Sequence, residues 1–413
     1  MRIKTLAILL AAMCAAMAVA ITTAVARTPR THAHAAASVL GTPDRAKGTP
    51  VVFGADNMNV APGAAFPESQ QAAVAMVDYI NTYKGGLDGH PIKIDWCATD
   101  GTPAQSGSCA KQLIADHVKA IIGASDLSSP VTLPLYAKAH LAYLGGMDFT
   151  PAENTASNAV ILNDAAQLGN VIAGEYAVKK LGGSSVAVIT LANPQGQFSA
   201  NMLWQPGIKQ AGGKYSLFSV PLTSATVMST VEQAVTSGAK VIGLEDPGQC
   251  LGLLQGLQAA GWHGPVISID PCSAPVTVKA AGSAANGLYW TQPFQVPATH
   301  TPDANLAVAI LAKYAPKNIP IDSPALTEMS TVMDIWSAFH ATSPSKLKES
   351  FILKTFRSGK NHKNFLAAPY TCNSKAIPAY KAVCNASYYV YKIVNGQPVK
   401  VATPTNEGAG LIK

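Results

Sequence analysis

The hydrophobic positions along this chain follow two alternating patterns, one typical of buried strands and one typical of amphipathic helices. A short apolar run at residues 49–56 predicts a buried strand. Within residues 67–83 the apolar positions recur at helical spacing, and Gly85 and Gly86 then stop the helix. Residues 92–96 alternate between apolar and polar side chains and predict a second strand. The folded region therefore begins with a strand–helix–strand unit.

The same alternation continues as far as residue 270. Strands that alternate with helices at this spacing predict parallel, doubly wound sheets, and there are too many strands for one comfortable sheet. We therefore expect an α/β protein with two lobes. The expected strands are residues 118–124, 141–146, 184–192, 214–220, 239–245 and 265–270, and the expected helices lie near 109–117, from 130, and at 165–183, 198–212, 227–237 and 250–260.

The pattern changes after residue 287. Residues 287–294 predict a lone strand, three helices follow, and the end of the chain again alternates as strands do. Within residues 386–401 the dipeptide Asn395-Gly396 separates two alternating runs, which is a strong signal for a β-hairpin. A chain that leaves a completed series and returns through helices is expected to cross between the lobes more than once.

The first 26 residues predict a secretory signal. Arg2 and Lys4 precede a long apolar run, and the small residues at 24–26 form a cleavage site, with a second candidate at 33–35. Because the apolar run reaches spanning length, an uncleaved membrane anchor is the alternative. Cys14 is preceded by a methionine rather than a small residue, which favours cleavage over lipid attachment.

Composition and charge exclude several classes of protein. Of the 413 residues, 48% are hydrophobic and 13% are charged, which excludes a disordered chain. The formal net charge is +7, and the chain without its first 26 residues keeps +5, because that segment holds two basic residues and no acid. There is no run of Lys and Arg, so we expect no nucleic-acid partner. Residues 27–48 predict a flexible linker, and His32 and His34 within it favour an unstructured tail over a metal site.

Six cysteines follow the signal, and they fall into three pairs that are local in sequence. Six cysteines allow fifteen pairings, but this grouping favours sequential disulfides in an oxidising compartment. Free buried thiols are the alternative, and the absence of C-x-x-C argues against zinc. The expected pairs are Cys97 with Cys109, Cys250 with Cys272, and Cys372 with Cys384.

The stretches that carry chemistry in common enzyme families are absent from the sequence. It has no G-x-S-x-G elbow, no G-x-x-x-x-G-K-[ST] phosphate loop and no H-E-x-x-H pair. We therefore expect no catalytic activity, no cofactor and no metal, although an enzyme stays open as an alternative.

The order of several motifs resembles the type I periplasmic solute-binding proteins, the leucine/isoleucine/valine-binding group that serves ABC importers. The segment "INTYKGGLDGHPI", the two cysteines around "TDGTPAQ", and "IIGA" before a serine-containing loop carry the resemblance. A weaker likeness runs through "SSVAVITLANPQGQFS" and "LLQGLQAAGWHGPVI" to about residue 400. Each motif is ordinary alone, and their order and spacing make the match.

The resemblance implies two α/β lobes joined by three crossings, with a ligand in the cleft and hinge closure as the mechanism. It implies a monomer in the periplasm or at the cell surface that captures a small polar solute, such as an amino acid or amide, for a membrane permease. A ligand sensor of the same fold without a transporter is the alternative. The lobes are expected at residues 49–166 with 294–345 and at 167–293 with 346–400, followed by a tail at 401–413.

Loops at the carboxyl ends of parallel strands are the expected ligand site. In the first lobe, Ser125 and Ser128 precede a helix that begins near Pro130, so hydroxyls and free N–H groups suit a carboxylate, and plain N-capping is the alternative. Asp148 could receive an ammonium or cap the next turn. The resemblance places a hydroxyl where this chain has Phe149, with Thr150 one position later.

The second lobe offers acids and one amide at the corresponding strand ends. Gln195 stands where the family often has a tyrosine. Asp246 follows Glu245 at the end of one strand, and Asp270 ends the next, close to the family's ammonium-binding position. Solvated carboxylates at the edge of the cleft are the alternative for these acids.

Overall fold

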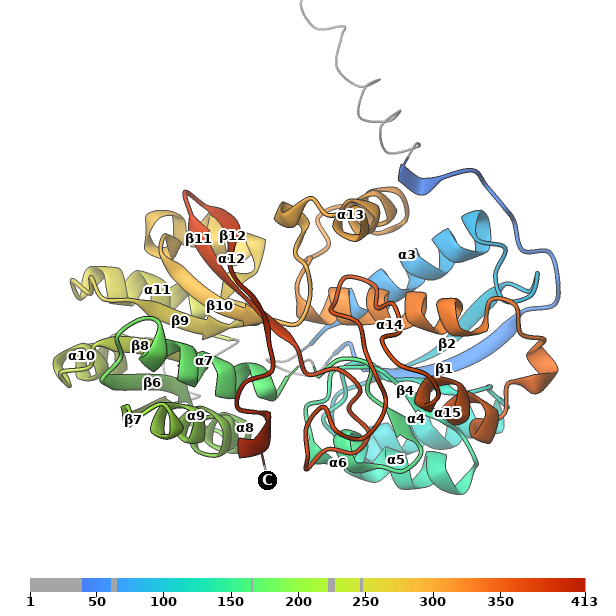
Figure 1. Ribbon diagram of the computed structural model, residues 1–413, viewed down its shortest axis with the longest axis horizontal. Helices are drawn as coiled ribbons and strands as arrows, with labels where there is room; N and C mark the ends of the chain where they lie inside the picture. The colour runs from blue at the N-terminus through green and yellow to red at the C-terminus, as the bar shows by residue number, and fades with distance from the viewer. Residues whose placement is uncertain (1–38, 61–64, 165, 222–226, 246–247, 413) are drawn as a thin grey trace, which may run out of the picture. The chain divides into compact units, whose positions relative to one another are not determined.

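A computed structural model describes residues 39–60, 65–164, 166–221, 227–245 and 248–412 (Figure 1). The predicted signal and most of the predicted linker lie outside these residues. Within the described part of the chain, no helix combines the length and apolar character needed to cross a membrane. All of the elements that follow belong to residues 43–413.

The first lobe is built on a parallel sheet of five strands in the order β2-β1-β3-β4-β5. The interior strand β1 is buried on both faces, as expected for a parallel sheet covered by helices, with Phe53 on one face and Asp56 on the other almost inaccessible. The elements are β1 (Val51–Met58), α3 (Pro67–Tyr83), β2 (Ile92–Thr99), α4 (Pro103–Ala115), β3 (Ile121–Ile122), α5 (Ser129–Lys138), β4 (Tyr143–Leu144), α6 (Pro151–Thr155) and β5 (Ala159–Val160).

The second lobe is built on a sheet of seven strands in the order β12-β11-β10-β9-β8-β6-β7. Strands β6 to β10 are parallel, and β11 and β12 form the predicted hairpin, antiparallel to β10. The strands are β6 (Ser185–Leu191), β7 (Lys214–Val220), β8 (Val241–Glu245), β9 (Val266–Ile269), β10 (Leu288–Gln292), β11 (Tyr388–Val394) and β12 (Gln397–Thr405).

Helices cover the second sheet (Figure 1). The predicted helix at 198–212 contains a π-helical turn, η1, that places the indole of Trp204 against β8. A Cβ atom at Gly243 would lie 2.7 Å from that indole, so only glycine fits at this point of the strand. The helices are α7 (Leu168–Lys179), α8 (Pro194–Phe198), η1 (Ser199–Trp204), α9 (Gln205–Gln210), α10 (Met228–Thr236), α11 (Cys250–Ala259), η2 (Asp270–Ser273), α12 (Pro275–Ala281) and η3 (Gly282–Ala285).

The helices after β10 return to the first lobe. Helix α14 packs along α3, and Arg357 at the end of α15 donates a hydrogen bond of 3.2 Å to the carbonyl of Ala159 in β5. The sequence predicts that residues 346–400 belong to the second lobe. Helix α15 falls within this range but contacts β5 of the first sheet. These elements are η4 (Pro297–Thr299), α13 (Pro302–Tyr314), α14 (Ser323–Phe339), η5 (Pro344–Lys346), α15 (Glu349–Arg357) and, at the end of the chain, η6 (Ala409–Leu411).

The chain passes between the two sheets three times. It leaves the first sheet after β5, returns after β10, and leaves again before β11. Before the last passage, the N–H of Ile161 donates to the carbonyl of Ala382 and the N–H of Cys384 donates to the carbonyl of Ile161, at 2.9 and 2.8 Å. Residues 382–384 therefore extend the edge of the first sheet, and the third crossing follows them.

Three disulfides join residues that are local in sequence, in the sequential pairing that the cysteine spacing favours. Cys97 in β2 is bonded to Cys109 in α4, which ties an edge strand to the helix that follows it. Cys250 begins α11 and is bonded to Cys272 in η2, so this bond joins the two helices that follow β8 and β9. Cys372 is bonded to Cys384.

Candidate functional site

Strand order locates a topological switch point in each sheet. In the first sheet β1 lies between β2 and β3, and in the second β6 lies between β7 and β8. Loops that leave neighbouring strands toward opposite faces diverge, and ligands bind in the space beyond such switch points in open α/β sheets. The loops after β1, β3, β6 and β8 are therefore the candidate site, and most of the predicted residues follow these or neighbouring strands.

Asn57, near the end of β1, organises the first-lobe edge. Its side chain is fully buried, donates to the carbonyl of Phe66 at 2.8 Å, and accepts a hydrogen bond of 3.0 Å from the N–H of Ser125. The hydroxyls of Ser69 and Ser125 are 3.0 Å apart. Sequence reasoning missed Asn57, although a polar amide near the end of an apolar strand was a usable signal.

The two predicted serines are engaged within the first lobe. Ser125 is fully buried; its N–H donates to Asn57 and its hydroxyl contacts that of Ser69. Ser128 donates its hydroxyl to the carbonyl of Gly101 at 2.9 Å, and its N–H donates to the carboxylate of Asp126 at 3.1 Å. Ser128 occupies the N-cap position of α5 but makes no side-chain capping bond. Both hydroxyls are thus hydrogen-bonded within the first lobe.

Phe149 and Thr150 have different roles in the structure. The ring of Phe149 stacks on Phe66 with 5.6 Å between centroids, and both side chains are half-buried. Thr150 caps α6 in a reciprocal arrangement with Glu153 and also contacts the hydroxyl of Ser129 at 2.7 Å. The stacked rings connect the loops after β1 and β4, whereas Thr150 is a capping residue.

Buried acids lie beneath these loops. Burial and the nearby carboxylate of Asp126 raise the pKa of Asp56 to about 7. Burial raises the pKa of Glu153 to about 7 as well. The first lobe therefore retains protons on internal carboxyl groups close to neutral pH, and its interior carries less charge than its composition suggests.

Asp148 lies at the first crossing rather than at an open surface. It is fully buried, and its Oδ1 accepts a hydrogen bond of 3.1 Å from the N–H of Ala166. Neighbouring Asp164 accepts from the N–H of Leu168 at 2.9 Å and from the hydroxyl of Tyr388 at 2.7 Å. These contacts join the start of α7 to the start of β11, so Asp148 belongs to the packing around the chain crossings.

The second lobe presents Gln195 at the same kind of edge. Gln195 is exposed on α8, whose N-cap residue Asn193 accepts from the N–H of Gly196 at 2.6 Å. Glu245 is buried, and its carboxylate accepts from the indole N–H of Trp204 at 3.0 Å. The predicted residue Asp246 lies outside the described residues.

Asp270 is committed to partners from its own and the opposite lobe. Its Oδ1 accepts 2.6 and 3.2 Å hydrogen bonds from the amide of Gln292 and the hydroxyl of Ser273, and its Oδ2 accepts from the N–H of Ser323 at 2.7 Å. Burial raises its pKa. The carboxylate predicted to receive an ammonium is thus hydrogen-bonded to the start of α14.

Further acids accompany Asp270. Burial, Asp270 and Glu68 together raise the pKa of Asp322 to about 8. Asp270 begins η2 directly after β9, Glu68 lies in the first turn of α3, and Asp322 is the N-cap residue of α14. No group of His, Cys, Asp and Glu residues within the described ranges could hold a metal ion.

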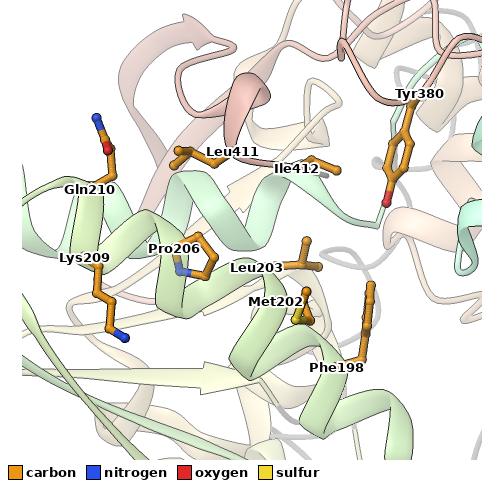
Figure 2. Close-up of a pocket in the computed structure, with 9 residues that line it drawn as sticks. All are labelled: Phe198, Met202, Leu203, Pro206, Lys209, Gln210, Tyr380, Leu411 and Ile412. Carbon is orange, nitrogen blue, oxygen red and sulfur yellow. The ribbon is translucent and has the colours of Figure 1, made fainter.

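A separate hollow of about 440 Å³ lies beside η1 and α9 (Figure 2). In Figure 2, Leu411 and Ile412 near the end of the chain face Leu203 and Pro206 across it. The hydroxyl of Tyr380, at its far side, donates to the side chain of Gln167 at 2.6 Å. None of the predicted solute-binding residues that the structure describes lines this hollow.

Comparison with known proteins identifies relatives of the whole arrangement. The sequence profile described as "periplasmic binding protein" matches residues 59–379. No curated protein matches the chain.

Several solved structures share the fold at low sequence identity. A branched-chain amino acid ABC transporter protein of Thermus thermophilus with bound valine has 14% identity and a TM-score of 0.75, covering 88% of this chain and 98% of its own. A leucine-binding protein of Thermotoga maritima has 14% identity and a TM-score of 0.69, covering 85% and 98%. A solute-binding protein of Rhodopseudomonas palustris in complex with p-hydroxybenzoic acid has 17% identity and a TM-score of 0.72, covering 87% and 99%.

Proposed function

This chain belongs to the periplasmic binding protein family, and from that premise we propose that it is an extracytoplasmic receptor for a small polar solute. It captures the solute between its two lobes and delivers it to an ABC permease by hinge closure. The observation that carries the proposal is a family match that spans both lobes, together with three chain crossings between the two sheets. The three disulfides support an oxidising compartment outside the cytoplasm.

The proposed solute is an amino acid, an amide or a small organic acid. Valine and p-hydroxybenzoic acid, which the similar structures bind, are both carboxylates of small size. In this chain the N-terminal ends of α3 and α5, where the helix dipole is positive and no N-cap side chain is bonded, would face the carboxylate. The stacked rings of Phe66 and Phe149 would contact the apolar part, and Gln195 would approach from the second lobe.

A ligand screen on the exported protein tests this proposal. The chain without residues 1–26 is purified from an oxidising compartment without denaturation, and any retained small molecule is identified by mass spectrometry after acid release. Thermal unfolding is then followed with leucine, valine, glutamine and 4-hydroxybenzoate. We expect at least one retained or added solute to raise the melting temperature, because a ligand that binds only the folded state stabilises it. Two results would contradict a receptor. One is chemical conversion of the solute by the protein; the other is an unchanged melting temperature with every solute together with no retained small molecule.

A further inference from the structure

One hydrogen bond crosses between the lobes at the end of β9. Asp270 follows β9 in the second sheet, and Ser323 is the first residue of α14, which packs on α3 in the first lobe. The N–H of Ser323 donates to Oδ2 of Asp270 at 2.7 Å. A carboxylate from one lobe therefore caps a helix of the other.

Gln292 closes the contact into a triangle. Its amide Nε2 donates to Oδ1 of Asp270 at 2.6 Å, and its Oε1 accepts from the hydroxyl of Ser323 at 2.8 Å. Asp270, Gln292 and Ser323 are 8%, 1% and 3% exposed. Gln292 is the last residue of β10, where the chain leaves the second sheet on its second crossing. The triangle is thus part of the hinge and is shielded from water.

Helix physics explains why a carboxylate is favoured at this position. The first N–H groups of a helix have no partner within the helix, and a buried one must find a partner elsewhere. The side chain of Asp322 accepts a hydrogen bond of 3.4 Å from the N–H of Ala325. The N–H of Ser323 donates instead to Asp270. A charge-assisted bond at the positive end of a 17-residue helix is stronger than one between neutral groups.

We propose that Asp270 is a positioning residue of the hinge rather than a solute ligand. By capping α14 from the opposite lobe, it stabilises the lobe arrangement of this structure and sets the free energy that solute binding must supply to change it. This inference rests on the proposed receptor function, because it assigns a role in the equilibrium between lobe arrangements.

Ser323 allows a matched pair of variants. Proline is well tolerated at the first position of a helix and lacks an N–H group, and the preceding residue Asp322 is already extended, at φ −122° and ψ −174°. Ser323→Pro therefore removes both the N–H that donates to Asp270 and the hydroxyl that donates to Gln292, whereas Ser323→Ala keeps the N–H and removes only the hydroxyl. Asp270→Ala removes the acceptor, and Asp270→Asn restores an oxygen that can accept from Ser323.

The test measures the distance between the lobes with no solute present. Spin labels on unnatural amino acids at exposed Lys111 in α4 and Glu232 in α10 report the distribution by double electron–electron resonance. We expect Ser323→Pro and Asp270→Ala to change the ratio of the lobe arrangements roughly tenfold, as the loss of one charged hydrogen bond implies. Ser323→Ala and Asp270→Asn should remain much closer to the original distribution.

An unchanged distance between the lobes in the variants would overturn the inference. If Ser323→Pro and Asp270→Ala fold, melt at a lower temperature and keep the original distance distribution, the triangle only stabilises the fold. Because no solute is added, the outcome does not depend on which solute binds. A failed ligand screen with a changed distribution would remove the receptor function and leave the hinge role of Asp270 standing.

Discussion

At the residue scale, Phe149 is the first-lobe candidate whose half-buried side chain is stacked on another ring rather than hydrogen-bonded. Its half-buried ring stacks on Phe66, while Ser125, Ser128 and Thr150 are hydrogen-bonded within the lobe. We expect Phe149→Ala to weaken binding of the solute found in the ligand screen about tenfold, since an aromatic contact contributes roughly 0.5–1.5 kcal/mol beyond its buried area. Isothermal titration calorimetry measures the change.

Phe149→Leu is the control for this variant. It keeps much of the apolar area and removes the stacking, so its affinity should fall between those of the original protein and Phe149→Ala. Equal affinities for all three proteins would place the solute elsewhere.

Glu153 makes the stability of the first lobe depend on pH. Burial raises its pKa from 4.5 to about 7, so the folded protein holds a proton that the unfolded chain releases. The stabilising contribution is therefore fully present below about pH 4.5 and is lost as the pH rises to about 7. Glu153→Gln keeps an oxygen that can accept from the N–H of Thr150 and removes the ionisation.

We expect Glu153→Gln to be the more stable protein at pH 8, by an amount on the order of 3 kcal/mol. At pH 5 the gain should be much smaller. Urea denaturation at the two pH values measures both, with Glu232→Gln on the exposed face of α10 as the control. A variant that is less stable at pH 8 would show that the carboxylate of Glu153 is stabilised by its capping contacts.

The sequence predicted the positions of the candidate residues at strand ends better than it predicted their hydrogen bonds. The rule that ligands lie beyond parallel strand ends selected Ser125, Asp148 and Asp270, and each does follow a strand of a parallel sheet. Their partners could not be read from the chain, because Asp270 bonds to Ser323, 53 residues away and in the other lobe. Hydrogen bonds of this kind depend on tertiary packing, which local patterns do not encode.

At the element scale, the disulfide between Cys250 and Cys272 holds the loops after β8 and β9 together. It closes a span of 22 residues, and a loop of this length is worth about 3 kcal/mol of stability in the chain-entropy description. We expect the double variant Cys250→Ala, Cys272→Ala to lose about this free energy of unfolding in urea. An unchanged unfolding midpoint and slope would mean that packing alone fixes these loops.

Long, strongly periodic elements were predictable and very short ones were not. The helix expected at 67–83 has those bounds in α3, and the hairpin signal at Asn395-Gly396 corresponds to β11 and β12. By contrast β3, β4 and β5 have two residues each. The hydrophobic pattern predicted neither β5 nor the short helix α6. Two residues are too few to show a period, so only pairing with neighbouring strands defines them.

At the scale of the whole molecule, the two-lobe organisation followed from the number of alternating strands and helices. The assignment of α15 did not, because an amphipathic helix can cover either sheet. Its position beside β5 depends on contacts such as that of Arg357 with Ala159. Lobe membership after residue 294 is therefore a property of the packed structure rather than of the local pattern.

Closure of the lobes on a solute is the motion on which the proposed receptor function depends. Single-molecule fluorescence transfer between labels at exposed Lys111 and Glu232, with and without the solute found in the screen, tests it most directly. We expect two lobe arrangements whose ratio shifts with solute concentration and saturates at one solute per chain. A solute that binds with one-to-one stoichiometry while the transfer efficiency stays constant would contradict it.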